Sequence, residues 1–228
     1  MAMIRQATPA EIEFYEDVLY PLQDQIFPLI RTDQLYLSGG TCLSRFYYQH
    51  RFSDDLDFFF DGYAHSQETF AMVVRDIANR ISNHFAIEMT VNGEYFKRFF
   101  VTHQNQPLKL EFVYENFKTV GMRQRVQGML IDSKENLAAN KLTAVYDRKT
   151  VKDFVDLYFL LQEIPFEKIA AWAKYKIVPL DYEGLIITFN DQRLEGEVLV
   201  RKPLTEPELN NFTAALIRQM FDYAKRDQ

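Results

Sequence analysis

The chain has 228 residues and a formal net charge of −6 at pH 7, with 47% hydrophobic and 15% aromatic residues. This composition predicts one large or two small folded domains and argues against long disordered stretches. The negative charge argues against non-specific adhesion to nucleic acid, although it allows a local basic groove, and the single cysteine excludes an intrachain disulfide.

No apolar run in the sequence approaches the roughly 18 residues that would span a bilayer. The first residues lead directly into a helix start and lack the apolar centre of a signal peptide. We therefore expect a soluble, cytoplasmic protein without a membrane partner.

The first 60 residues predict alternating helices and strands. Thr8, Pro9 and Glu11 form a helix-start pattern, and we expect Pro21 to kink or end that helix. The following elements are a strand over 34–38, a tight turn at Gly39 and Gly40, a helix over 41–50 and a strand over 55–60.

The rest of the chain changes from strands to helices. An amphipathic helix is predicted over 66–85 and strands over 87–91, 95–102 and 108–114. After about residue 133 the strand signals mostly stop, and helices are predicted over 133–146, 150–162, 166–175, 182–189 and 206–226. The prediction is an α+β fold, with a mixed sheet and flanking helices in residues 1–125. A helical domain in residues 126–228 is expected to complete a cleft.

A glycine pair follows the first predicted strand. Gly39 and Gly40, between Ser38 and Thr41, stand at a strand-to-helix turn, where backbone N–H groups and the helix dipole favour a phosphate. The alternative is that the two glycines only make a tight turn.

Three acids interrupt the predicted strands. Asp55 and Asp57 share one face of their strand, and Glu111 lies between apolar neighbours in a later strand. Two close carboxylates repel each other, and a hard cation such as Mg²⁺ would resolve that conflict. The alternatives are a solvated strand entry that includes Asp54, and an acid on the wet face of an edge strand.

The order of these patterns resembles the DNA polymerase β-type nucleotidyltransferase fold. The runs 39–43 (Gly-Gly-Thr-Cys-Leu) and 50–59 (His-Arg-Phe-Ser-Asp-Asp-Leu-Asp-Phe-Phe) are similar to the AbiEii/AbiGii toxin family of bacterial nucleotidyltransferases. The runs 140–149 and 152–158 resemble the helical motif of the same family, so the resemblance spans about residues 35–162. Cys42 stands where family members more often carry a smaller residue.

The resemblance implies roles for individual residues. It makes Asp55, Asp57 and Glu111 the ligands of Mg²⁺ or Mn²⁺, and it makes Ser38, Gly39, Gly40 and Thr41 the phosphate-binding turn. It also implies that Lys141 and Arg148 neutralise the triphosphate, that Arg51 touches the nucleotide, and that Asp153 and Asp156 lie close to the cleft.

Each of these helical residues has a structural alternative. Lys141 and Arg148 are also compatible with a solvated helix face, and Asp153 with a capping acid. Asp156 is compatible with an i,i+4 partner of Lys152, and His50 and Arg51 with a surface helix end.

The resemblance implies an enzyme that moves an NMP from an NTP to an acceptor hydroxyl, as the toxin of a toxin–antitoxin or phage-defence system with a cognate antitoxin. The acceptor is expected to be an RNA or tRNA end, or a protein. Arg98, Arg123, Arg125 and Lys134 are candidates for an RNA-facing groove. The alternative is a non-catalytic module that senses nucleotide or binds a partner.

Overall fold

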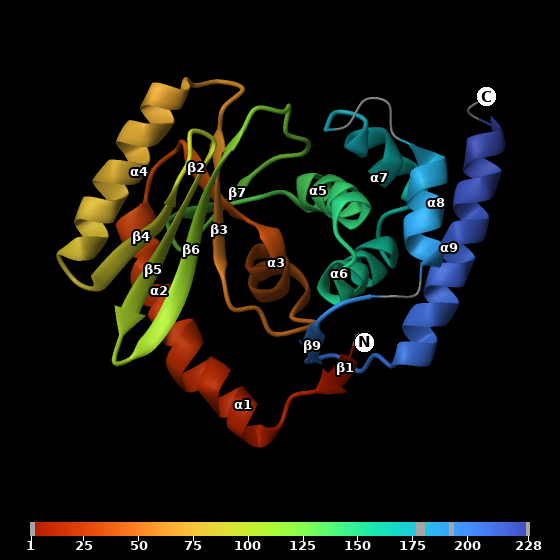
Figure 1. Ribbon diagram of the computed structural model, residues 1–228, viewed down its shortest axis with the longest axis horizontal. Coiled ribbons are helices and arrows are strands. Elements are labelled where there is room, and N and C mark those ends of the chain that lie inside the picture. Colours follow the sequence, from red (N-terminus) through yellow and green to blue (C-terminus); the bar gives the residue numbers. More distant parts are fainter. Residues whose placement is uncertain (1–2, 177–180, 192–193, 227–228) are drawn as a thin grey trace.

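The computed structural model describes residues 3–176, 181–191 and 194–226. In these residues a seven-stranded mixed sheet forms one half of the molecule, and most of the later helices form the other half (Figure 1). The strand order is β4-β5-β6-β3-β2-β8-β7. The bounds are β2 (Leu35–Ser38), β3 (Leu56–Asp61), β4 (Ala86–Asn92), β5 (Phe96–His103), β6 (Gln106–Glu115), β7 (Gln124–Val126) and β8 (Met129–Ile131).

The first helical segment begins as predicted but does not end at Pro21. Thr8 caps α1 (Pro9–Glu13), and Glu11 completes the capping box. A π-helical stretch over 14–19 follows, then α2 (Tyr20–Ile26) and a 3₁₀ turn over 27–30. Pro21 lies where the π-helical stretch passes directly into α2, and the chain remains helical through it.

Two further helices support the sheet. Gly39 opens α3 (Gly39–Cys42), which continues as a π-helical stretch over 43–48. Ser66 caps α4 (Gln67–Ser82), as the amphipathic pattern predicts. Its buried stripe of Phe70, Val74 and Ile77 joins the core that also contains Phe58 and Phe112 of the sheet. The apolar positions of β3 therefore face this core, while the alternate positions face the other way.

The predicted helices after residue 133 are confirmed. They are α5 (Lys134–Asp147), α6 (Val151–Leu161), α7 (Phe166–Ala173), α8 (Tyr182–Asn190) and α9 (Glu206–Arg226). None of the helices in the described ranges is both long and apolar enough to cross a membrane.

Four short strands were not predicted. β1 (Met3–Gln6) pairs in parallel with β9 (Glu197–Val200), and the antiparallel pair β7–β8 extends the main sheet. Gln127 and Gly128 form the tight turn of that pair, both with positive φ, which is the geometry of a two-residue hairpin. The sheet thus takes strands from both sides of residue 125, and the division into two domains stays a prediction.

Candidate active site

One row of residues crosses the centre of the sheet. In the strand register Ser38 lies beside Asp57, Asp57 beside Glu111, and Glu111 beside Arg98. Because neighbouring strands pleat in phase, residues of one row project from one face. The strands that carry Asp57 and Glu111 are therefore direct neighbours in the sheet.

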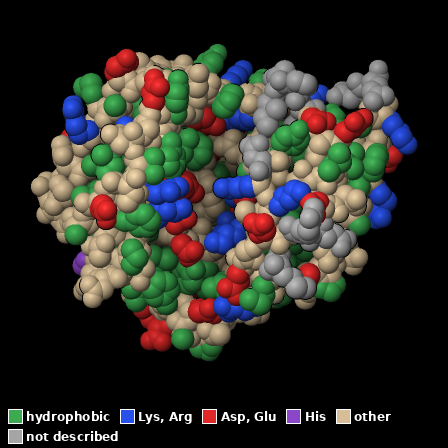
Figure 2. Space-filling view, in the orientation of Figure 1, with side chains coloured by type: hydrophobic (Ala, Val, Ile, Leu, Met, Phe, Trp, Pro, Cys, Tyr) green, Lys and Arg blue, Asp and Glu red, His purple; other side chains and the backbone are tan. Residues whose placement is uncertain are grey.

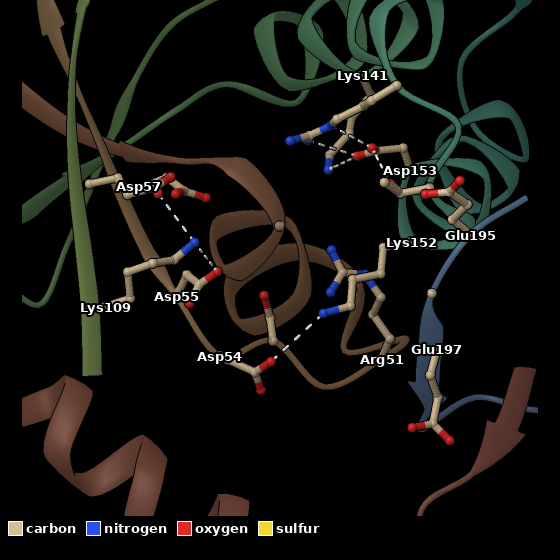
Figure 3. Close-up of a pocket in the computed structure, with 16 residues that line it drawn as sticks. Arg51, Asp54, Asp55, Asp57, Lys109, Lys141, Lys152, Asp153, Glu195 and Glu197 are labelled. Atoms are coloured by element: carbon tan, nitrogen blue, oxygen red, sulfur yellow. Dashed lines mark hydrogen bonds and ion pairs between the residues drawn. The ribbon is translucent and has the colours of Figure 1, made fainter. Parts of the chain in front are cut away.

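A cleft of about 420 Å³ opens over this row, between the sheet and the helices α5 and α6. Figure 2 shows a central hollow with acidic and basic side chains gathered at its rim. In Figure 3 Asp54, Asp55, Asp57 and Lys109 lie on the sheet side, opposite Lys141, Lys152 and Asp153. The lining includes eight predicted site residues: Gly40, Arg51, Asp55, Asp57, Glu111, Lys141, Arg148 and Asp153.

The Asp57 carboxyl lies at the floor of the cleft in an unfavourable environment. Burial, together with the negative charges of Glu111 and Asp55, raises its pKa to about 7. Within the described residues, no hydrogen bond or ion pair to this carboxyl is present. Asp57 is therefore a partly buried acid that a cation would stabilise.

Lys109 supplies part of the missing positive charge. Its Nζ lies 2.9 Å from Asp55 Oδ2 and 3.2 Å from Glu111 Oε1. Arg98 contacts Glu111 from the other side, at 2.7 Å. Burial alone would raise the pKa of Glu111, but these two cations lower it, so Glu111 is a carboxylate at neutral pH.

The opposite wall is a buried network of cations and acids. Arg51 holds Asp156 with two hydrogen bonds of 2.7 and 2.9 Å, and Lys141 Nζ lies 2.6 Å from Asp156 and 2.8 Å from Asp153. Arg148 contacts Asp153 at 2.8 Å but leaves 60% of its side chain exposed toward the cleft. Three cations thus share two acids, and the network carries one net positive charge.

The pKa shifts in this network follow from the pairing. Burial alone would raise the pKa of Asp156, but Arg51 and Lys141 hold it well below its usual range. Burial lowers the pKa of His50 even though its Nε2 contacts Asp156 at 2.7 Å. His50 is fully buried and Lys141 is 6% exposed. A surface helix end for His50 and Arg51, a solvated face for Lys141 and a surface pair between Asp156 and Lys152 are therefore wrong.

The glycine pair makes room for two charged side chains of the site. A Cβ on Gly39, whose φ is +66°, would lie 2.2 Å from Asp57 Oδ2. A Cβ on Gly40 would lie 2.3 Å from Arg51 Nη2. The two glycines thus allow this close approach, and their phosphate-binding role stays a prediction.

Two predicted phosphate-binding residues use their side chains elsewhere. The Ser38 hydroxyl donates to Asp132 Oδ2 at 2.7 Å, and the Thr41 hydroxyl bonds to Ser53 and to the backbone carbonyl of Asp55. Both residues are buried, and their side chains do not line the cleft. Any contact from this turn to a phosphate would therefore come from the backbone.

The donor set fits a hard divalent cation by its chemistry. Carboxylate oxygens are the ligands that Mg²⁺ and Mn²⁺ prefer, and the raised pKa of Asp57 reflects its burial and, after that, the negative charges of Glu111 and Asp55. Among the described residues, no three His, Cys, Asp or Glu side chains are grouped closely enough to hold a metal ion in this arrangement. Lys109, between Asp55 and Glu111, would have to move for all three acids to bind one ion.

Sequence reasoning missed several lining residues. Lys109, Lys152, Glu195 and Glu197 all reach the cleft. Lys109 stood two residues before Glu111 in the same strand, so the alternation of side chains was the signal that would have found it. Glu195 and Glu197 had no local signal, because distant parts of the chain place them: Glu195 pairs with Thr150, and Glu197 pairs with Met3.

The four cations suggested for an RNA-facing groove all pair with acids, and the groove itself stays a prediction. Arg98 contacts Glu111, Arg123 contacts Asp61 at 3.1 Å, Arg125 contacts Asp33, and Lys134 contacts Glu163 at 2.6 Å. Each of the four cations is thus paired with an acid.

Comparisons with known proteins agree with this geometry. The family model for the nucleotidyl transferase AbiEii toxin of type IV toxin–antitoxin systems matches residues 23–226. No curated protein is similar enough in sequence to match.

Solved structures share the fold. A candidate nucleotidyltransferase from Helicobacter pylori has a TM-score of 0.60 at 22% identity, over 93% of this chain and 98% of that chain. JHP933 from Helicobacter pylori has a TM-score of 0.58 at 21% identity, over 97% of both chains. MenT4, a nucleotidyltransferase toxin from Mycobacterium tuberculosis, has a TM-score of 0.60 at 15% identity, over 90% of this chain and 83% of that chain.

Proposed function

Because this chain belongs to the AbiEii family of nucleotidyl transferase toxins, we propose that its cleft transfers an NMP unit from an NTP to an acceptor hydroxyl. The observation that carries the proposal is the pairing of Asp57 and Glu111 in one strand row, beside Asp55 and opposite Lys141 and Arg148. An acidic wall facing a cationic wall matches the needs of phosphoryl transfer, in which charge placement supplies most of the catalysis.

Asp55, Asp57 and Glu111 would hold Mg²⁺ or Mn²⁺. When bound, a divalent ion supplies positive charge that lowers the pKa of an acceptor hydroxyl and neutralises charge on the leaving pyrophosphate. The partly exposed Arg98–Glu111 pair would fix the orientation of one of these carboxylates, since Glu111 accepts from Arg98 Nε at 2.8 Å.

The cationic wall would bind the triphosphate. Arg148 is the most accessible cation of this wall. Lys141 and Arg51 are buried behind it and add positive charge, and Asp153 and Asp156 fix their positions. Such prepositioned cations cost little reorganisation when charge develops on the leaving group. Lys152, 46% exposed and 3.7 Å from Asp54, borders the same space.

We propose an RNA end as the acceptor and a cognate antitoxin as the partner. The family description, which names a toxin–antitoxin system, supports a partner for this chain. RNA binding would weaken as salt rises, because phosphate contacts release counterions. Binding that ignores salt would favour a protein hydroxyl instead.

The decisive experiment compares two positions of the radioactive label. The protein is incubated with magnesium, total RNA or cell lysate, and each NTP labelled at the α- or the γ-phosphate. Transfer of an NMP predicts that only the α-label enters a macromolecule. Label from neither position would favour the non-catalytic nucleotide-sensing alternative, and label from the γ-position would indicate a kinase.

A further inference from the structure

A second hollow begins where the first cleft ends. It has a volume of about 480 Å³ and shares Arg148 with the cleft. Phe59, Val113 and Phe117 line it from the sheet side, and Asn140 and Thr143 line it from α5. We call it the Phe59–Asn140 pocket. Its volume lies in the range of small-molecule sites.

The strand register fixes the position of this pocket relative to the acids. Phe59 and Val113 are register partners, and each lies two residues beyond Asp57 or Glu111 on the same strand face. Two residues of a strand span about 6.6 Å. That distance is comparable with the ribose that separates the α-phosphate of a nucleotide from its base.

The lining suits a flat aromatic ring better than a charged group. Phe59 and Val113 offer apolar surface, and Phe117 is 51% exposed. Figure 2 shows hydrophobic side chains beside the central hollow on its sheet side. The acid at the far end, Glu115, is neutralised by Lys176 Nζ at 2.5 Å, so it does not repel a nucleotide.

One polar group in the pocket wall lacks a partner. Asn140 Nδ2 is buried and makes no hydrogen bond in the described part of the chain. A buried donor without an acceptor is costly, so a ligand with a carbonyl oxygen or ring nitrogen would be favoured there. The edges of nucleobases carry such acceptors.

We propose that the Phe59–Asn140 pocket binds the base of the NTP substrate. The base lies between Phe59 and Phe117 and accepts a hydrogen bond from Asn140, while Arg148 spans the junction between base and triphosphate. This inference rests on the proposed function for the direction of the NTP in the cleft. It adds a substrate-binding site outside the charged cleft.

The test measures equilibrium binding of the full chain to each of the four NTPs and to inorganic tripolyphosphate, with magnesium and without an acceptor. Phe117→Ala and Asn140→Leu are compared with Phe221→Ala, which removes a phenylalanine of similar exposure, 50%, from α9. Loss of stacking or of the hydrogen bond should raise the Kd of the preferred NTP at least about fivefold. The Kd of tripolyphosphate, which has no base, should stay unchanged.

Two outcomes would overturn the inference. One is an unchanged NTP Kd in both pocket variants. The other is an unchanged NTP Kd with weaker binding of the RNA acceptor, which would indicate that the pocket binds a base of the acceptor instead. Failure of the proposed function looks different, because α-label transfer would then be absent while base-dependent NTP binding remains. Asn140→Leu should unfold at the same or a higher temperature than wild type, since it removes an unpaired buried donor.

Discussion

At the scale of single residues, Asp57 shows how a side chain with a proposed function can lower stability. Its carboxyl has a pKa of about 7 because burial and two neighbouring acids disfavour the charge. A residue chosen for stability alone would be neutral here. Replacing Asp57 should therefore have two opposite effects: it should preserve or increase the stability of the fold, and it should abolish the proposed activity.

Asp57→Asn should abolish transfer and preserve or increase stability. Loss of a metal-binding carboxylate is expected to reduce the transfer rate by about a thousandfold or more. The free energy of unfolding at pH 8 should stay constant or rise by about 1–3 kcal/mol, as the partly screened charge is removed. Label transfer and urea unfolding measure the two effects.

Asp61→Asn is the matched control for this prediction. Asp61 lies on the same face of β3, but it pairs with Arg123 and does not line the cleft. Transfer by this variant should equal that of wild type. Equal transfer by Asp57→Asn would refute the proposed role of Asp57.

Gly39→Ala should disturb the site through sterics alone. A side chain at φ +66° costs about 1–2 kcal/mol, and its Cβ would also displace the Asp57 carboxylate. Gly196 has a similar φ of +88°, but a Cβ there meets nothing within 4 Å. Gly39→Ala should therefore lose more unfolding free energy than Gly196→Ala in urea titrations. Equal losses would show that the contact with Asp57 is unimportant.

At the scale of elements, prediction worked where the sequence pattern was local. The apolar–acid alternation of 55–60 predicted β3, and the helices after residue 133 followed from caps and periodicity. The pairing of Asp57 with Glu111 was not predicted from the residues alone, although the family resemblance implied that the two acids share a site. The strands β1, β7, β8 and β9 have only 3–4 residues each and were missed. Whether such short segments form strands depends mostly on the strands with which they pair, and not on their own sequence.

The joining of α5 and α6 by buried charges was only partly predictable. The sequence put Lys141 and Asp156 in consecutive helices, but it did not reveal that His50 and Arg51 complete their network. Burial of a charge depends on tertiary contacts, and local sequence carries little information about these.

Asp156→Asn should therefore destabilise the protein strongly. It leaves Arg51 and Lys141 buried with one carboxylate fewer, and breaking such a network typically costs about 3–5 kcal/mol. Glu163→Gln is the surface control, since Glu163 pairs with Lys134 at 2.6 Å and is half-exposed, so its loss should cost less than about 1 kcal/mol. Similar denaturation midpoints for both variants would contradict the importance of the network.

At the scale of the whole molecule, the buried Asp132 should make stability depend on pH. Burial raises its pKa from 3.8 to about 7, although Asn136 and Ser38 donate hydrogen bonds to it. Between these two values the folded protein holds a proton that the unfolded chain has lost. The contribution of Asp132 to stability therefore falls as pH rises, and it levels off above about pH 7.

Comparison with Asp132→Asn isolates this effect. The raised pKa of Asp57 gives a slope of the same sign, and the lowered pKa of His50 gives the opposite slope below pH 6.5, so wild type alone would mix these groups. The stability of the variant relative to wild type should rise by roughly 3 kcal/mol between pH 5 and pH 8. Urea unfolding at several pH values gives the difference, and a gap that does not vary with pH would rule out Asp132 as its source.

The short segment that includes β9 ties the two walls of the cleft together. Glu195 exchanges backbone hydrogen bonds with Lys149 and Val151 beside α6, and Leu199 accepts one from Phe52 ahead of β3. Its other edge pairs with β1 (Figure 1). A ribosome must therefore have made about residue 200 before this cleft can close. A nascent chain would lack the complete walls of the candidate site for most of its own translation, so the proposed activity would appear only near the end of synthesis.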